Sequence, residues 1–548
     1  MAHALAGKPV QEQDIIDVQT IVDAYFDNVP DMTNPTQLVS FGTSGHRGTS
    51  VDGTFTDLHV AAITQAICDG RKQFGATGPI FVGQDTHALS QPALVTVLEV
   101  LAGNGVTAMV DCDMAFVPTP SVSRAIIRYN EEHDDKADGI IITPSHNPPD
   151  NGGIKYNTII GGPADTVVTK WIEMRANEYL TAYCESEDFK RISIDNIEPT
   201  AQVPYDYKGL YVEELGDVIN MEAIKAAGPK VLVDTLGGSG ASYWNVIKER
   251  YGLDLTIIHD DYDPTFSFMT YDHDGKVRMD CSSTYVMASV INRIGDFDLA
   301  VGNDPDYDRY GIVVSSGLIS ANTFLTLAAR YLFTTRGWKN KGVGKTVVCT
   351  TMIDKWAADT ETPVFEVPVG FKYFSQLLFD GAIGIGGEES AGASFLKKDG
   401  TVWTTDKDGM IMALLSMEIM AVMGKSALKM ADEFVEEFGN PSFGRIDAPC
   451  KKEQKQILKQ MSAELITATT VDGDPITNIR TTSLYNDMPI DGVRVETDKG
   501  WFVARPSGTE DLYKIYGESY KGDLGLVALL TAGEEIVNAA LNGTIETE

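Results

Sequence analysis

One serine in this sequence stands where a nucleophile could be presented at the end of a buried strand. The apolar run 139–142 predicts a short strand, and it is followed by the segment Thr-Pro-Ser-His-Asn-Pro at 143–148. The prolines at both ends of this segment favour a rigid, non-helical turn, because each proline restricts the residue before it. We therefore expect Ser145 and His146 to lie side by side in a surface turn.

Three carboxylates alternate along a second loop, which follows the apolar run 299–301. Asp304, Asp306 and Asp308 can converge on one hard cation through oxygen ligands. An EF-hand is not predicted, because its sixth loop position would be Arg309 rather than glycine. Three protein oxygens suit Mg²⁺, which commonly completes its octahedron with water and a phosphate oxygen. The spacing therefore predicts a magnesium site.

Two further loops carry weaker signals when each is taken alone. After the apolar run 382–385, Glu388 and Ser390 stand among small residues, which suits the close approach of a polyhydroxylated ligand. Near the C-terminus, Arg505 precedes the segment Pro-Ser-Gly-Thr at 506–509. Its guanidinium, hydroxyls and backbone N–H groups can bind an oxyanion.

Taken in this order, the four loops resemble those of the α-D-phosphohexomutase superfamily, in particular its bacterial phosphoglucomutase branch. The resemblance spans nearly the whole chain, since it is carried by the segments 41–48, 143–156, 303–311, 386–395 and 505–516. It implies an isomerase that interconverts glucose 1-phosphate and glucose 6-phosphate. It further implies a phosphoryl group on Ser145, with glucose 1,6-bisphosphate as the intermediate and activator.

The resemblance also implies which residues form the site. The metal would be bound by Ser145, Asp304, Asp306 and Asp308, and Arg47 and Arg309 would neutralise charge on the phosphoryl group. The sugar would be contacted by Glu388, Ser390, Lys372 and Lys407. The distal phosphate would be bound by Arg505, Ser507, Gly508 and Thr509. For removal of the sugar hydroxyl proton, Lys155 and His146 are alternatives. Burial near Mg²⁺ and Arg47 would lower the pKa of Lys155, which favours Lys155 slightly as the base. The alternative role for Lys155 is an electrostatic clamp on the phosphate.

The order of elements predicts the domains that position these loops. A short apolar run, a helical stretch, a second run and a loop-bearing third run recur three times, at 79–83, 106–110 and 139–142; 231–233, 255–258 and 299–301; and 346–349, 364–368 and 382–385. This order predicts three α/β domains with mixed sheets, whose ligands lie beyond the strand carboxyl ends. The segment 342–346 resembles the end of a P-loop but lacks its first glycine, so we interpret it as a turn.

After about residue 439 the pattern changes to a predicted amphipathic helix at 451–465 and strands at 493–495 and 501–504. We therefore expect a smaller C-terminal α+β domain, joined by a possible hinge at 438–441. The predicted domains are 1–205, 206–320, 321–439 and 440–548, arranged around a central cleft.

Composition excludes several classes of protein. The 548 residues include 44 Lys plus Arg and 78 Asp plus Glu, and this net charge of −34 argues against nucleic acid and anionic membranes as partners. Six cysteines without a Cys-x-x-Cys pair indicate neither a disulfide framework nor a zinc site. No signal-peptide pattern and no uninterrupted apolar 18-mer are found, so we expect a cytoplasmic monomer or homodimer acting on small hexose phosphates.

Three alternatives to a glucose-specific mutase remain. A phosphomannomutase or dual-specificity phosphohexomutase would share the same loops. A non-catalytic sugar-phosphate sensor would not need Ser145 and all three aspartates together. A phosphatase would gain little from a separate cradle for a second phosphate.

Overall fold

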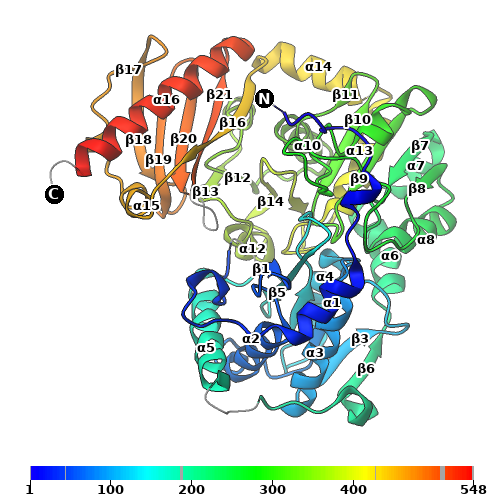
Figure 1. The fold of residues 1–548 in the computed structure, drawn as a ribbon. Helices are drawn as coiled ribbons and strands as arrows, with labels where there is room; N and C mark the ends of the chain where they lie inside the picture. The colour runs from blue at the N-terminus through cyan, green and yellow to red at the C-terminus, as the bar shows by residue number, and fades with distance from the viewer. Residues whose placement is uncertain (1, 43–44, 185–188, 426, 507–511, 546–548) are drawn as a thin grey trace. The chain divides into compact units, whose positions relative to one another are not determined.

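A computed structural model describes residues 2–42, 45–184, 189–425, 427–506 and 512–545 (Figure 1). The chain divides into two compact units. The first contains Met1–Ala321, Ser375–Gly381 and Ser390–Leu428, and the second contains Asn322–Phe374, Ala382–Glu389 and Lys429–Glu548.

The first sheet of the first unit carries the serine loop. Its strand order is β1-β5-β4-β2-β3-β6, with β5 antiparallel to both neighbours and the other pairs parallel. The strands are β1 (His46–Thr49), β2 (Ile80–Gln84), β3 (Ala108–Asp111), β4 (Asp138–Ile142), β5 (Asn151–Asn157) and β6 (Gln202–Tyr205). The associated helices are α1 (Val18–Asp27), α2 (Asp57–Gly70), α3 (Ser90–Gly103), α4 (Thr119–Glu132), α5 (Thr166–Cys184) and α6 (Tyr207–Val218).

This sheet is buried on both faces, which explains the uninterrupted apolar runs in its sequence. Ile140 and Ile142 of β4 belong to one core, together with buried side chains of α2, α3 and α5. Ile141, between them, points into a second core with Phe81 and Tyr207. Because successive side chains of a strand alternate between faces, a strand covered on both sides is apolar at every position.

The second sheet of the first unit carries the aspartate loop. Its order is β11-β10-β9-β7-β8, in which β7 is parallel to β8 and β9, while β10 is antiparallel to β9 and β11. The strands are β7 (Val231–Asp234), β8 (Leu255–Ile258), β9 (Leu299–Asn303), β10 (Tyr310–Val314) and β11 (Gly317–Leu318). The same unit contains α7 (Met221–Ala227), α8 (Ala241–Tyr251), α9 (Ala288–Ile291), α13 (Gly409–Met423) and β15 (Ala393–Phe395).

In the second unit, β12 (Gly342–Thr346) pairs in parallel with β13 (Val364–Val367) and β14 (Ile383–Gly387). The prediction of a turn at 342–346 is therefore wrong, and so is the prediction of the strand at 346–349. Lys345 lies inside β12 with 1% of its surface exposed, because its ammonium pairs with the Asp354 carboxylate. The helices that lie wholly or mostly in this unit are α10 (Ala321–Arg336), α11 (Met352–Asp359) and α14 (Ala427–Phe438). The helix α12 (Lys372–Phe379) begins in this unit and belongs to the first unit from Ser375 onward.

The C-terminal part of the second unit is a separate antiparallel sheet with the order β16-β21-β20-β19-β18-β17. Its strands are β16 (Ser442–Pro449), β17 (Thr470–Val471), β18 (Asp474–Thr482), β19 (Pro489–Thr497), β20 (Gly500–Pro506) and β21 (Leu512–Ser519). The predicted helix at 451–465 is shorter, since α15 is Lys452–Lys459 and a 3₁₀ turn follows at Ala463–Leu465.

The long helix α16 (Gly522–Ile545) lies across this sheet, in contact with β16, β20 and β21 (Figure 1). Its residues 522–542 form the one described helix that is long and apolar enough to cross a membrane by length and composition. Leu529, Leu530, Val537 and Leu541 are buried in the C-terminal core, so packing on the sheet accounts for these apolar residues. Three α/β sheets and a C-terminal α+β sheet confirm the predicted fold class, while the predicted domain boundaries remain predictions.

Candidate active site

Ser145 and the three aspartates follow the carboxyl ends of β4 and β9, both in the first unit. Each loop contains one non-glycine residue in the left-handed region, with φ of 60° at Ser145 and 62° at Tyr307. This conformation is uncommon outside glycine, and it persists only where the surrounding structure holds it. The two loops are therefore held in place by their contacts rather than by local preference.

Ser145 is 1% exposed, so the expectation that it lies in a surface turn is wrong. Its Oγ donates a hydrogen bond to Asp304 Oδ2 at 2.8 Å and lies 3.3 Å from Nδ1 of His146. Its backbone N–H donates to Thr143 Oγ1 at 2.8 Å. The turn is buried because a loop of the next domain packs on it, with the Met279 N–H donating to the His146 carbonyl at 3.2 Å.

Asp304, Asp306 and Asp308 form a buried cluster in which one oxygen of each lies within 4.8 Å of the others. Lys155 Nζ donates to Oδ2 of Asp306 at 2.6 Å and to Oδ2 of Asp308 at 3.2 Å. Within the described part of the chain, the Oδ1 atoms of Asp306 and Asp308 are buried without a hydrogen-bond partner. Buried carboxylate oxygens need a partner, and oxygen ligands are those that Mg²⁺ prefers, so the cluster fits this ion.

Basic side chains lie close to these carboxylates. Burial lowers the pKa of Arg47 on β1, although the neighbouring aspartates favour its charged form. Burial alone would also lower the pKa of Lys155, but the carboxylates of Asp306 and Asp308 outweigh it and raise that pKa. The two carboxylates thus oppose the effect of burial on Lys155, and the expectation of a lowered Lys155 pKa beside Mg²⁺ stays a prediction.

The segment 407–409 holds the aspartate loop from the other side. Lys407 Nζ forms an ion pair with Asp308 Oδ2 at 3.0 Å, and the Gly409 N–H donates to the Tyr307 carbonyl at 2.9 Å. A Cβ atom at Gly409 would lie 2.0 Å from the carbonyl oxygen of Arg309, so only glycine fits this approach. The structure thus brings the predicted Lys407 to the metal cluster.

His146 has a different electrostatic environment from Lys155. Burial lowers its pKa well below the usual value, and the nearby Arg309 guanidinium lowers it further, so the imidazole is neutral. Asp280, which no sequence motif marks, lies 3.9 Å from Nε2 of His146 and 3.3 Å from a guanidinium nitrogen of Arg309. Thr119 is a second missed contact, since its hydroxyl donates to Asp306 Oδ2 at 2.8 Å. Both contacts depend on tertiary structure and have no signal in the sequence.

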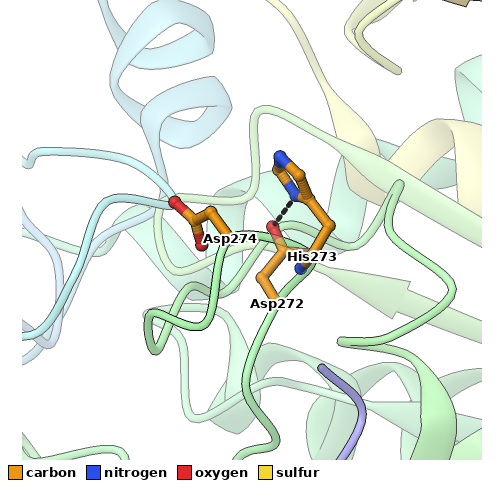
Figure 2. A group of neighbouring side chains, drawn as sticks. All are labelled: Asp272, His273 and Asp274. Atoms are coloured by element: carbon orange, nitrogen blue, oxygen red, sulfur yellow. Dashed lines mark hydrogen bonds and ion pairs between the residues drawn. The ribbon is translucent and has the colours of Figure 1, made fainter. Parts of the chain in front are cut away.

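A second group of possible metal ligands, Asp272, His273 and Asp274, lies in a turn of the same unit (Figure 2). The Asp272 carboxylate already accepts hydrogen bonds from Ser283 Oγ at 2.5 Å and from the His273 N–H at 2.7 Å. Asp274 is paired with Arg278 at 2.9 Å. Protein donors therefore already contact both carboxylates of this group.

The remaining predicted residues are distributed between the two units. Glu388 is buried directly after β14, Lys372 begins α12 and Arg505 lies in β20, all in the second unit. Ser390 is half-buried in the first unit. Ser507, Gly508 and Thr509 lie outside the described residues. The roles of all these residues remain predictions.

Profiles of four domains from one protein family match consecutive parts of this chain. They are described as phosphoglucomutase/phosphomannomutase alpha/beta/alpha domains I, II and III and the C-terminal domain, and they match residues 38–182, 210–317, 320–438 and 447–524. The chain therefore belongs to the α-D-phosphohexomutase superfamily, as its loop motifs indicate.

Individual relatives agree with this assignment. A phosphoglucomutase from Komagataeibacter xylinus is 46% identical over 539 residues, which cover 97% of each chain. Phosphoglucomutase 1 of Saccharomyces cerevisiae is 26% identical and covers 88% of each chain. The open form of parafusin, a phosphoglucomutase from Paramecium, shares the fold with a TM-score of 0.72 and 20% identity, over 94% of this chain and 96% of that one.

Proposed function

We propose that this phosphohexomutase is a phosphoglucomutase, which interconverts glucose 1-phosphate and glucose 6-phosphate. In this proposal Ser145 carries the transferred phosphoryl group and glucose 1,6-bisphosphate is the bound intermediate. The observation that carries the proposal is the position of Ser145 Oγ, 2.8 Å from Asp304 in the buried carboxylate cluster. The name of the K. xylinus relative supports the choice of glucose among hexoses.

Charge neutralisation is the main demand of this reaction, because a phosphoryl group in transfer carries charge on several oxygens. Arg47, Lys155 and Arg309 would supply fixed positive charge from three different segments. Mg²⁺ held by Asp304, Asp306, Asp308 and the oxygen on Ser145 would neutralise further charge on that phosphoryl group.

Proton transfer is assigned from the protonation states of the two candidate residues. A neutral His146, whose Nδ1 lies 3.3 Å from Ser145 Oγ, can exchange a proton with the serine oxygen as that oxygen gains and loses its phosphoryl group. Lys155 is paired with two carboxylates that favour its charged form, so in this proposal it serves as the electrostatic clamp. This assignment favours His146 over Lys155 as the acid–base residue.

The other proposed contacts hold the sugar and its second phosphate. Glu388 and Ser390 would bind sugar hydroxyls, with Lys372 and Lys407 as further contacts, and the distal phosphate would be bound by Arg505, Ser507, Gly508 and Thr509. These contacts must serve both orientations of the sugar, because the bisphosphate turns end for end between the two half-reactions.

A coupled assay of glucose 6-phosphate formation from glucose 1-phosphate tests the proposal. We expect Ser145→Ala to reduce turnover to background, and intact mass to show one phosphoryl group on the parent protein that this variant lacks. Ser50→Ala is the matched control, because Ser50 is also a buried serine of the domain formed by the first sheet, and its hydroxyl donates to the Ile21 carbonyl at 2.7 Å. Activity retained in Ser145→Ala would refute the proposal, and a higher specificity constant for mannose 1-phosphate would assign the chain to the mannose branch instead.

A further inference from the structure

Two buried residues that the proposed reaction does not use, Asp85 and His87, directly follow β2, the parallel neighbour of the serine-bearing β4. Both side chains are completely buried. The Asp85 N–H donates to the carbonyl of Ile142, the last residue of β4, at 3.0 Å. Oδ1 of Asp85 accepts hydrogen bonds from the His87 N–H at 3.0 Å and from Ser90 Oγ at 2.6 Å. Asp85 is therefore fixed in position beside the start of the serine loop.

This pair contacts the serine loop on both sides of Ser145. On the N-terminal side, the Thr143 hydroxyl donates to Asp85 Oδ2 at 2.6 Å. This bond directs a lone pair of Thr143 Oγ1 toward the Ser145 N–H, which donates to that oxygen at 2.8 Å. On the C-terminal side, Nε2 of His87 lies 3.1 Å from the Asn147 carbonyl oxygen. The residues two before and two after Ser145 are thus bound to one pair, and between them Ser145 has its left-handed φ of 60°.

The hydrogen-bond partners of His87 define its protonation state. Nδ1 lies 2.8 Å from the Asp85 carboxylate and Nε2 faces a carbonyl oxygen, and both of these groups can only accept. Both ring nitrogens must therefore carry protons. His59 of the same domain shows the opposite pattern, because its Nδ1 accepts the Thr56 N–H at 3.2 Å and must be unprotonated.

Electrostatics agrees with a charged His87. Burial alone would lower the pKa of His87, but the Asp85 carboxylate outweighs burial and raises it, and the more distant Asp306 acts in the same direction. The Phe266 ring, with its centroid 5.1 Å from that of the imidazole, brings no charge. Conversely, His87 and the hydroxyls of Ser90 and Thr143 lower the pKa of Asp85 in spite of its burial.

We propose that Asp85 and protonated His87 are positioning residues, which hold the backbone of Ser145 so that its Oγ faces the carboxylate cluster. This inference rests on the proposed function, in which Ser145 carries the phosphoryl group. The pair contacts the loop through Thr143 and Asn147 and does not touch the reacting atoms. Its loss should therefore slow phosphoryl transfer and leave the binding of sugar phosphate largely unchanged.

The experiment compares Thr143→Val and His87→Gln with a matched control, Thr96→Val. Thr96 is equally buried in the same domain, and its hydroxyl also donates to a carboxylate at 2.6 Å, that of Asp57. For the two loop variants we expect kcat to fall by about tenfold to a hundredfold, the size of effect that a slightly misplaced nucleophile produces. We expect KM for glucose 1-phosphate to stay within about twofold, since ground-state binding is unchanged. Thr96→Val should keep the parent kcat.

Two further measurements separate the failure of this inference from failure of the proposed function. Intact mass of the parent and of Ser145→Ala after incubation with glucose 1,6-bisphosphate reports whether the parent carries a phosphoryl group that depends on Ser145. An unphosphorylated, active parent would refute the proposed function. If the parent is phosphorylated but Thr143→Val and His87→Gln keep its kcat, the positioning role is refuted alone. A loss that Thr96→Val shares equally would refute it too, because general destabilisation would then explain the effect.

The protonation of His87 can be observed directly in the parent protein. The chain has eight histidines, so a ¹⁵N-histidine sample gives a small set of ring signals, and the signal missing from His87→Gln is that of His87. We expect both of its ring nitrogens to be protonated at pH 7. One unprotonated nitrogen at that pH would overturn the ionic form of the proposal.

Discussion

Acidification from pH 7 to pH 5 should destabilise the first unit through one buried histidine, His59 of α2. Its Nδ1 accepts the Thr56 N–H at 3.2 Å and its Nε2 lies 2.8 Å from the carbonyl oxygen of Gln37. These partners require the neutral ring. Burial, followed by the stacked His46 imidazole at 5.3 Å, lowers the pKa of His59 to about 3.

The sign and size of the effect follow from the difference between this pKa and that of an unfolded histidine, about 6.5. Between these two values the unfolded chain binds a proton that folded His59 does not, so stability falls as the pH falls. The loss is about 1.4 kcal/mol per pH unit below 6.5, or about 2 kcal/mol at pH 5.

Urea unfolding followed by circular dichroism, at pH 7 and at pH 5, measures this loss. Other groups titrate over the same range, so the parent is compared with His59→Gln, whose amide can replace both hydrogen bonds without binding a proton. We expect the parent to lose about 2 kcal/mol more than His59→Gln between the two pH values. The exposed His133 provides the control, and His133→Gln should behave like the parent. Equal losses in the parent and His59→Gln would refute the reasoning.

Three other outcomes are expected. Asp306→Asn should weaken Mg²⁺ binding and lower turnover by orders of magnitude, and activity of the parent that persists in a chelator would contradict the metal assignment. Glu366→Gln should lower the thermal midpoint of the second unit, because it disrupts the buried ion pair in which Arg480 nitrogens lie 2.5 and 3.0 Å from the Glu366 carboxylate. We expect a loss of about 3–5 kcal/mol of stability, and an unchanged midpoint would count against a stabilising role of that pair. Arg505→Ala should raise KM for glucose 1-phosphate by about 10- to 100-fold, and its activity should depend more on added glucose 1,6-bisphosphate than that of the parent. A normal KM would exclude Arg505 as the distal phosphate ligand.

The strands that carry the loops could be predicted because burial on both faces makes them apolar at every position. This condition holds for β4 and β9, whose sequence runs match the observed strands within two residues at either end. The apolar pattern is missing from β12, which contains Lys345 between a glycine and a threonine. The sequence of β12 therefore resembles a polar turn. What makes Lys345 acceptable in a strand is its ion pair with Asp354, a contact between segments that no local pattern encodes.

The same distinction applies to the site. Ser145 and the aspartates could be predicted because each set of functional groups is contiguous in the sequence, so its spacing is visible. Asp85 and Asp280 are single carboxylates in segments without a motif, and only the packing of their loops gives them partners. Lys155 shows why such packing matters, since burial disfavours its charged form and the carboxylates 2.6 and 3.2 Å away favour it. A sequence motif can therefore predict which groups meet, but the protonation state of those groups depends on the distances at which they meet.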